Sequence, residues 1–293
     1  MNIRLIELLY FMFVRIPARL RGWLRRNHVR LHWGRGLNNF GDCLQPLIAK
    51  YYGMTPEYVP STINADIILQ GTILQWLDSN YAGIIAGSGA DEKDLDFPLA
   101  KVVGVRGALT KARIRGAAND VVYGDPGLLM PFIKSYPKTG EYDLGIIPHF
   151  CDKNDGIIKR FIENNSELRI VVIDVLPHPL SVCEMLNRCK YIFSSSLHGL
   201  IIADAYDVPN LRFTISKNRI NPNDSYKFDD YYSSFRKQER NNHVCIELTG
   251  YERWSDIKYK FVSNYDKVHS LMTELDRTLR ECFDKIRMSK YGK

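Results

Sequence analysis

The sequence predicts an α/β protein built from two doubly wound, Rossmann-like domains. Short β-branched apolar runs alternate with amphipathic runs of helical length. They form two series on either side of residues 134–142, a stretch with proline, lysine and glycine that interrupts the apolar pattern and is the candidate linker. Parallel sheets covered by helices on both faces give this pattern, because each parallel crossover needs a helix. A chain of 293 residues with 45% hydrophobic side chains is long enough for two such units.

The first series, residues 29–136, alternates strands that end in glycine-containing turns with helices. Apolar residues at every second position predict strands, and spacings of three and four predict helices. We expect a strand at 29–33, a loop at 34–42, a helix at 43–53, strands at 65–71 and 82–90, a strand and short helix over 101–116, and a turn at 124–126 within 121–133.

The second series, residues 137–264, repeats the pattern. Strands are expected at 143–150, 168–178, 190–196 and 209–214, and helices at 156–165, 179–189 and 198–207. Residues 217–242 are polar and aromatic without a sustained period, so they form either an ordered flap over a site or a mobile surface loop. The segment 265–293 carries apolar residues spaced by four and is expected to be a helix that packs back on the domains.

The N-terminal arm, residues 1–28, is basic and amphipathic. Residues 1–35 hold eight arginines and one acid, whereas basic and acidic side chains are equal in number in the rest of the chain. The apolar run 5–14 is too short for a transmembrane helix and is followed by arginines rather than by a cleavage site. Leu20, Trp23 and Leu24 share one helical face among arginines, which favours contact with an anionic membrane over docking on the protein itself.

The remaining composition excludes several classes of protein. The six cysteines show no zinc-binding spacing and no disulfide pattern, and we expect no metal. Because the excess charge of +7 resides in the arm, a body that binds nucleic acid is also disfavoured.

Polar turns follow the expected strands and predict a site between the two domains. One rim carries 38–42, 87–89 and 105–107, and the other carries 148–150, 176–178 and 194–199. Ligands of doubly wound sheets bind at the carboxyl ends of the strands, so these rims should face one another across a cleft. The residues that this places together suit an anion and proton transfer: Asp42, Arg106, His149, His178 and His198.

Five ordered motifs resemble the polysaccharide pyruvyl transferase family. They read "NNFGDCLQPLI", "VGVRGALT", "GDPGLLMP", "IIPHF" and "SSSLHGLIIADAYDVPNLRF", and they extend from about Val29 to Phe213. The resemblance implies two Rossmann-type domains arranged as in GT-B glycosyltransferases. It also implies transfer of an enolpyruvyl unit from phosphoenolpyruvate to two hydroxyls of one sugar, with release of phosphate and without a cofactor other than this co-substrate.

The resemblance further implies where such an enzyme acts. Family members modify surface polysaccharides such as capsules and exopolysaccharides. The expected acceptor is a sugar on a polyprenyl-diphosphate-linked precursor, and the expected location is the inner face of the cell membrane, reached through the arm.

The family's motif positions imply the site residues. His198 is expected to contact the phosphate and act as the acid, Arg106 to clamp the anion, and Asp42 to act as the base or to orient the sugar. Roles without a catalytic function remain possible for two of these residues, since Asp42 could cap a helix and Arg106 could lie on the surface. Gly41 and Gly199 are expected at close approaches, and the three serines are expected to cap the helix of His198. The expected substrate-binding residues are Asn38, Asn39, Gly41, His149, Ser194, Ser195, Ser196 and Gly199.

One position departs from the family pattern. Many members have Ser-Arg-Leu-His where this chain has Ser196 in place of the arginine. The cation must then come from elsewhere, and the candidates are Arg106, Lys153, Arg212, Lys217 and Arg219.

Two other functions remain open at this point. The first is a nucleotide-sugar glycosyltransferase, which would place carboxylates eight residues apart at this helix. Asp204 fits the second position, but the first is Ser196. The second is a membrane-bound scaffold that binds a glycan without catalysis, which the presence of Asp42, Arg106 and His198 disfavours.

Overall fold

Two parallel sheets form the frame of the protein. The computed structural model describes residues 12, 14, 16–34, 40–176, 178–215, 225–235 and 243–291. The first sheet has the strand order β2-β1-β3-β4-β5-β6 and the second has β11-β10-β9-β7-β8, and every pairing between these strands is parallel. The predicted α/β class with two Rossmann-like sheets is confirmed.

The first sheet and its helices occupy the chain as far as residue 133. Gly53 has a φ of 73°, a conformation that suits glycine, and it follows the first long helix as expected. The elements are α2 (Ile16–Leu24), β1 (His28–Leu31), α3 (Leu44–Tyr51), β2 (Thr55–Tyr58), η2 (Thr62–Asn64), β3 (Ile67–Ile68), η3 (Leu74–Trp76), β4 (Ile84–Ala86), β5 (Lys101–Val105), α4 (Ala108–Arg113), β6 (Val122–Tyr123), η4 (Pro126–Leu129) and α5 (Met130–Ile133).

The second sheet and its helices begin at the end of the stretch 134–142. Within the segment 217–242, which the sequence left open, the described residues form the helix α9. The elements are β7 (Tyr142–Ile147), α6 (Gly156–Asn164), β8 (Ile170–Val172), α7 (Pro179–Asn187), β9 (Cys189–Ser194), α8 (Leu197–Ala205), β10 (Asn210–Thr214), α9 (Tyr226–Tyr232), β11 (Cys245–Glu247), α10 (Trp254–Ile257), η7 (Lys258–Lys260) and α11 (Tyr265–Tyr291).

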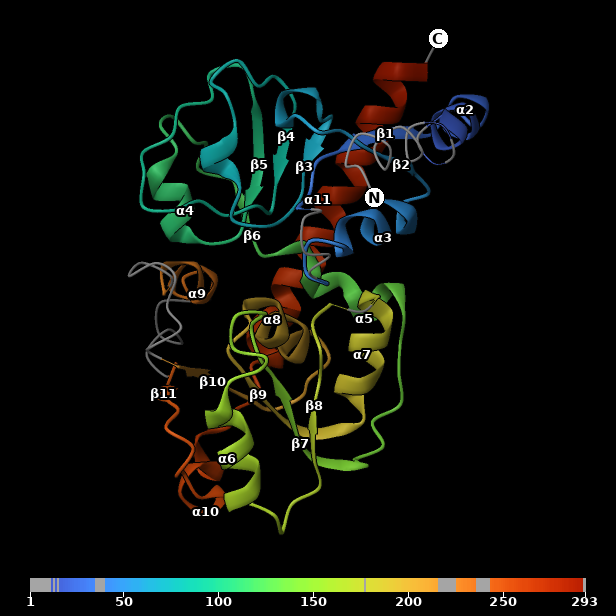
Figure 1. The fold of residues 1–293 in the computed structure, drawn as a ribbon. Helices are drawn as coiled ribbons and strands as arrows, with labels where there is room; N and C mark the ends of the chain where they lie inside the picture. The colour runs from blue at the N-terminus through green and yellow to red at the C-terminus, as the bar shows by residue number, and fades with distance from the viewer. Residues whose placement is uncertain are drawn as a thin grey trace.

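Figure 1 shows the two sheets one above the other, with α8 between them, and α11 extends from beside α8 along the first sheet. One continuous apolar core joins the halves, because buried residues of α3, η4, α8 and α11 belong to the same cluster as one face of each sheet. Two smaller clusters cover the opposite face of each sheet. The predicted domain boundary at residues 136 and 137 lies between β6 and β7 and stays a prediction.

The order of the strands sets the position of a site. Strand order reverses between β1 and β3 in the first sheet and between β7 and β9 in the second. At such a switch point the loops after neighbouring strands diverge to opposite faces and leave room for a ligand. Asp42 follows β1 and His198 follows β9. Each residue therefore lies next to the switch point of its own sheet.

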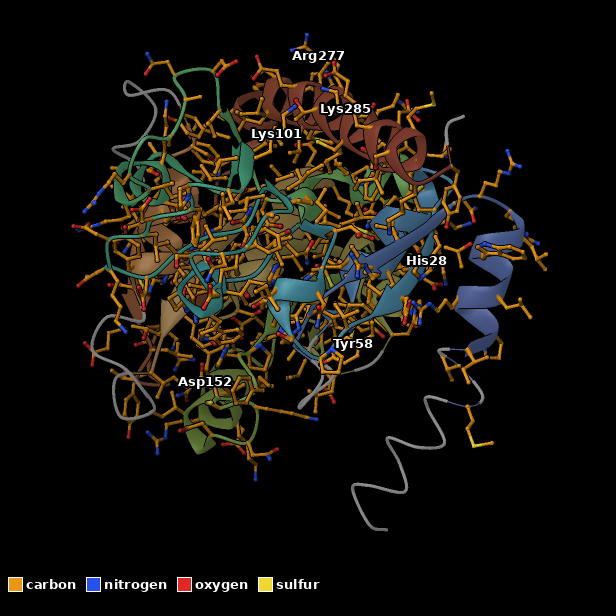
Figure 2. The ribbon with its side chains drawn as sticks, turned by 90° about the horizontal axis from the view of Figure 1, so that it is seen from above. His28, Tyr58, Lys101, Asp152, Arg277 and Lys285 are labelled. Atoms are coloured by element: carbon orange, nitrogen blue, oxygen red, sulfur yellow. The ribbon has the colours of Figure 1, made fainter. Side chains whose placement is uncertain are left out.

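The helix α2 lies beside the edge of the first sheet, against β1 and β2. In Figure 2 it stands at the side of the molecule next to the strand that begins at His28. Leu20, Trp23 and Leu24 are 54%, 64% and 66% exposed, so the expected apolar face points to solvent rather than into the core. Among the residues that the structure describes, no helix is both long and apolar enough to cross a membrane.

Candidate functional site

A cluster of buried and half-buried polar side chains lies where the carboxyl edges of the two sheets meet. We define this polar cluster as Asp42, Gln70, Arg106, Asp125 and His198. The first four follow β1, β3, β5 and β6 of the first sheet, whereas His198 follows β9 of the second. Nε2 of His198 lies 3.8 Å from Oδ2 of Asp125, so the two edges face each other as predicted.

His198 is the second residue of α8, and backbone holds its ring closely. A Cβ on Gly41 would overlap the imidazole, and the ring of Phe40 meets it edge-on at 6.2 Å between centroids. Burial lowers the pKa of His198 to about 4, and the charges of Arg106 and Lys227 lower it further against the opposite effect of Asp42. Nε2 is buried without a hydrogen-bond partner among the described residues. The imidazole is therefore neutral and has a nitrogen available to a ligand.

Asp125 is fully buried at the start of η4. Its Oδ1 accepts a hydrogen bond of 2.8 Å from the Gly127 N–H, whereas Oδ2 has no partner in the described part of the chain. Burial raises the pKa of this carboxyl to about 6, against the opposing effects of that hydrogen bond and of Arg106. Asp125 and His198 thus form a carboxyl–imidazole pair in which each partner has one unoccupied polar atom.

Arg106 is 1% exposed and is held on two sides. Its Nε donates to Asp230 Oδ2 at 2.8 Å and its Nη1 donates to Thr72 Oγ1 at 2.7 Å. Nη2 is buried and has no partner among the described residues. A Cβ on Gly89 would overlap the guanidinium, so glycine is required there. The alternative that Arg106 is a surface arginine is wrong, and one guanidinium nitrogen can bind an anion.

Asp42 lies beside the backbone of two glycines. A Cβ on Gly34 would be 2.8 Å from its Oδ2, and a Cβ on Gly71 would be 3.6 Å from its Oδ1. Burial raises the pKa of Asp42, while the nearby His198 lowers it and Asp125 raises it. The N-cap of α3 is Cys43 and not Asp42. The alternative prediction that Asp42 is a helix cap is therefore wrong.

These residues give the site a defined chemistry. A buried guanidinium nitrogen, the first N–H groups of α8 and a neutral imidazole suit a small anion. A carboxyl whose pKa is about 6 beside that imidazole suits proton transfer near neutral pH. A second carboxylate, Asp42, is close enough to His198 and Asp125 to affect and be affected by their charges.

A family model described as polysaccharide pyruvyl transferase matches residues 20–217. The chain belongs to this family. The match includes every member of the polar cluster, and it confirms the family that the ordered sequence motifs indicate.

Two similar proteins have no function in their names. An uncharacterised protein of Acanthamoeba polyphaga mimivirus is 28% identical over 181 residues, which are 60% of this chain and 59% of that protein. The chain thus spans less than two thirds of that curated relative. A functionally uncharacterised protein of Klebsiella pneumoniae, whose structure is solved, covers 80% of this chain and 98% of its own at 13% identity and a TM-score of 0.41.

The serines before α8 in this pyruvyl transferase family member form hydrogen bonds with other groups of the protein. Ser194 donates to the Ile147 carbonyl at 2.8 Å and accepts from the Ser196 N–H at 3.0 Å. Ser195 donates to Asp152 and accepts from the His149 N–H at 2.8 Å. Ser196 is the N-cap of α8, but its hydroxyl makes no capping hydrogen bond. The prediction that these hydroxyls cap the helix is wrong, and their assignment to substrate binding stays a prediction.

The other predicted site residues fall in different places. Gly41 and Gly199 are at close approaches, as expected, since a Cβ on Gly199 would overlap Ser194 Oγ. The ring of His149 lies 4.2 Å from that of Phe150. His178 caps α7 by accepting the Leu180 N–H at 3.3 Å and is outside the polar cluster. Asn38 and Asn39 lie outside the described residues.

The candidate replacements for the family arginine at position 196 are now reduced. Lys153 forms an ion pair with Asp174, and Arg212 stacks over the Phe228 ring at 3.7 Å. Lys217 and Arg219 lie outside the described residues. Arg106 is the one candidate that the structure places in the polar cluster.

Sequence reasoning missed several contributors to the site. Asp125 was read only as part of a turn in "GDP", although it follows a buried strand at the same edge as Arg106. That position is the signal that could have identified it. Gln70 donates to the Gly41 carbonyl and thereby holds the glycine under His198. Asp230 gave no local signal, because it reaches Arg106 from a segment 124 residues away.

Proposed function

We propose that this protein transfers the enolpyruvyl group of phosphoenolpyruvate onto two hydroxyls of one sugar, forming a cyclic ketal and releasing phosphate. The observation that carries the proposal is the set of three buried polar atoms without partners among the described residues: Arg106 Nη2, Asp125 Oδ2 and His198 Nε2. Unsatisfied buried polar atoms destabilise a fold, and a ligand that pairs with them offsets this cost. Together they offer one cation and one proton-transfer pair.

Arg106 and the start of α8 would hold the donor. Phosphoenolpyruvate has a phosphate and a carboxylate on a short enol, so its binding requires several fixed donors at close range. Nη2 of Arg106 and the N–H groups of the first turn of α8 are donors of this kind. The bound anion would favour the protonated form of His198 and raise its pKa from about 4.

Asp125 and His198 would supply the proton for the first step. The proton goes to the methylene carbon of the enol, positive charge develops at the adjacent C2, and a sugar hydroxyl oxygen bonds to C2. Asp42 would accept the proton of that hydroxyl. A second hydroxyl then bonds to C2 while the C2–O bond to phosphate breaks, and the proton of this hydroxyl leaves with the phosphate. No electron transfer is involved, so the proposal needs no cofactor.

The acceptor is proposed to be a surface-polysaccharide precursor linked to a polyprenyl diphosphate. The support comes from α2, where exposed Leu20, Trp23 and Leu24 lie next to Arg25 and Arg26. A helix with this composition binds the interface of an anionic membrane. The enzyme would thus act from the inner face of the cell membrane, where such precursors are assembled.

Asp204, the carboxylate that supported the alternative of a nucleotide-sugar glycosyltransferase, has a structural role instead. Asp204 is fully buried and accepts hydrogen bonds from Asn210, Tyr231 and Asn264, at 2.6, 2.8 and 3.0 Å. Through these hydrogen bonds, Asp204 of α8 joins β10, α9 and the residue before α11. Because its oxygens are occupied, we infer that it does not bind a nucleotide sugar.

The experiment incubates the protein with phosphoenolpyruvate and sugar acceptors on lipid diphosphates ending in galactose, mannose or glucose. We expect phosphate release together with an acceptor mass gain of one pyruvate minus one water. Turnover of nucleotide sugars alone would refute the proposal in favour of a glycosyltransferase. Glycan binding without any reaction across a broad acceptor set would instead support the scaffold.

A further inference from the structure

The helix α9 belongs in sequence to the second half of the protein but docks on the first. It follows β10, yet it lies against α4, as Figure 1 shows and as contacts between the two helices confirm. The Leu109 N–H donates to Ser233 Oγ at 3.1 Å, next to the end of α9. A Cβ on Gly107 would overlap the Asp230 carbonyl, so the docked helix approaches the N-terminus of α4 as closely as backbone allows.

Asp230 is the centre of this docking contact. It is fully buried, and its carboxylate accepts hydrogen bonds from Arg106 Nε at 2.8 Å, from the Thr110 N–H at 2.7 Å and from Thr110 Oγ1 at 2.7 Å. All three donors belong to the first half. One carboxylate therefore stabilises the first turn of α4 and pairs with the guanidinium of the polar cluster.

This contact determines where the free nitrogen of Arg106 lies. A guanidinium is planar and rigid, so fixing Nε on Asp230 and Nη1 on Thr72 also fixes Nη2. Without Asp230 the guanidinium would keep its hydrogen bond to Thr72 as its one side-chain partner among the described residues. The side chain could then rotate, and part of the energy of anion binding would be spent on ordering it.

The same helix carries a second cation. Lys227 is on α9, and its charge helps to lower the pKa of His198, after the larger effect of burial. The docked helix thus affects the polar cluster in two ways, through the position of Arg106 and through the charge of Lys227.

We propose that Asp230 is a positioning residue which couples the docking of α9 on α4 to the binding of an anion by Arg106. The proposal rests on the proposed function in one respect, since it takes the phosphate or carboxylate of phosphoenolpyruvate as that anion. Coupling between two sites is reciprocal, so a bound anion must in turn stabilise the docked position of α9.

Asp230→Asn tests this coupling with an isosteric side chain. The asparagine oxygen can still accept the Thr110 N–H, but its NH2 group opposes Arg106 Nε, donor against donor. Ser233→Ala is the matched control, because it removes a docking hydrogen bond of α9 without touching Arg106. Asp230→Glu keeps the charge and should restore part of what Asp230→Asn loses.

Two measurements are made on each full-length variant. Titration calorimetry with phosphoenolpyruvate and with inorganic phosphate gives anion affinity, and amide hydrogen exchange at residues 107–113 and 226–232 reports docking. We expect Asp230→Asn to weaken anion affinity by at least tenfold and to raise KM for phosphoenolpyruvate more than it lowers kcat. Ser233→Ala should bind both anions within about threefold of the wild type, and anions should slow exchange in α9 of the wild type.

The outcomes separate this proposal from the proposed function. Faster exchange in Asp230→Asn with unchanged anion affinity would overturn the coupling and leave the proposed function intact. Equal losses of affinity in Asp230→Asn and Ser233→Ala would show that general loosening is responsible, which also overturns it. A wild-type protein that binds neither anion would refute the donor site itself, and the coupling with it.

Discussion

Nε2 of His198 and Oδ2 of Asp125 lie 3.8 Å apart, although the two residues follow strands of different sheets. Neither atom has a hydrogen-bond partner among the described residues, and both are buried. The pair exists only when the two halves are assembled, so the proton transfer that we propose depends on the interface between them. The following predictions test the pair and the residues that hold it.

Asp125→Asn should abolish most turnover while the fold remains. The amide keeps the acceptor for Gly127 N–H but has no proton to exchange near neutral pH, and loss of a general acid or base typically costs about 10²–10⁴-fold in rate. Phosphate release from phosphoenolpyruvate in the presence of acceptor gives the rate. Asp256→Asn, on the exposed surface of α10, is the control, and a rate for Asp125→Asn within threefold of the wild type would contradict the prediction.

The stability of the protein should depend on pH through the same two groups. Burial raises the pKa of Asp125 from 3.8 to about 6, so the folded protein holds a proton that the unfolded chain has released, and this group makes the free energy of unfolding fall as pH rises between those values. Burial lowers the pKa of His198 from 6.5 to about 4, and this group makes the free energy of unfolding rise with pH between those values.

The two contributions oppose one another, and variants separate them. In Asp125→Asn, the free energy of unfolding should rise more steeply with pH between pH 4 and 6 than in the wild type. The difference between the two slopes should correspond to about one bound proton. His198→Gln should show the opposite change. Urea unfolding at several pH values measures these slopes, and identical slopes in the wild type and both variants would contradict the assigned pKa shifts.

Gly41→Ala should remove activity without unfolding the protein. The added Cβ would overlap the His198 ring, which must then leave its position opposite Asp125. We expect at least a tenfold lower rate of phosphate release. Gly156→Ala is the matched control, because a Cβ there has nothing within 4 Å, and its rate should equal that of the wild type. Full activity of Gly41→Ala would show that the ring position is not critical.

Tyr231→Phe should destabilise the protein in a pH-dependent way. The phenol donates to Asp204 at 2.8 Å, and burial raises the pKa of that carboxyl to about 6. A hydrogen bond to an ionised group contributes about 1.5–3 kcal/mol. The loss in free energy of unfolding should therefore be larger at pH 8 than at pH 5, as measured by urea unfolding. The exposed Tyr251 supplies the control Tyr251→Phe, which should change stability little at either pH.

Trp23→Ala should weaken binding to membranes. Trp23 is 64% exposed on α2 next to Leu24, and an interfacial aromatic ring contributes both apolar area and position at the headgroup level. We expect a several-fold loss of co-sedimentation with vesicles rich in phosphatidylglycerol. Trp76 is 59% exposed in η3, so Trp76→Ala controls for the loss of any surface tryptophan. Equal binding by all three proteins would refute the membrane role of α2.

Much of the fold followed from periodicity, but the assembly of the site did not. The strands that carry Arg106 and His198 were predictable, because buried runs end in short polar turns that also mark the edge where ligands bind. β2 and β11 were missed, since "TPEY" and "CIE" are short edge strands with weak alternation. The role of Asp230 could not be predicted for another reason. It comes from a contact between residues 124 positions apart, and periodicity reports only local structure.

The roles that the family resemblance predicts for His198 and Arg106 stay predictions. The resemblance did not predict what holds these side chains, because Gly41 and Gly89 act by leaving space beside them and Asp230 acts by pairing with Arg106 from a distant segment. The departure at Ser196 was visible in the sequence. Which cation takes the place of that arginine stays a prediction, although the structure has Arg106 in the polar cluster and Lys153 in an ion pair with Asp174.

The helix α11 completes the first sheet from the far end of the chain. Tyr52 donates to Asp276 Oδ1 at 2.8 Å, Arg287 donates to the Tyr52 carbonyl at 3.1 Å, and Lys290 pairs with Asp66. These contacts span more than 200 residues of sequence, and closing such long loops slows folding. During synthesis the first sheet is made early, but these three contacts can form only after α11 has been made.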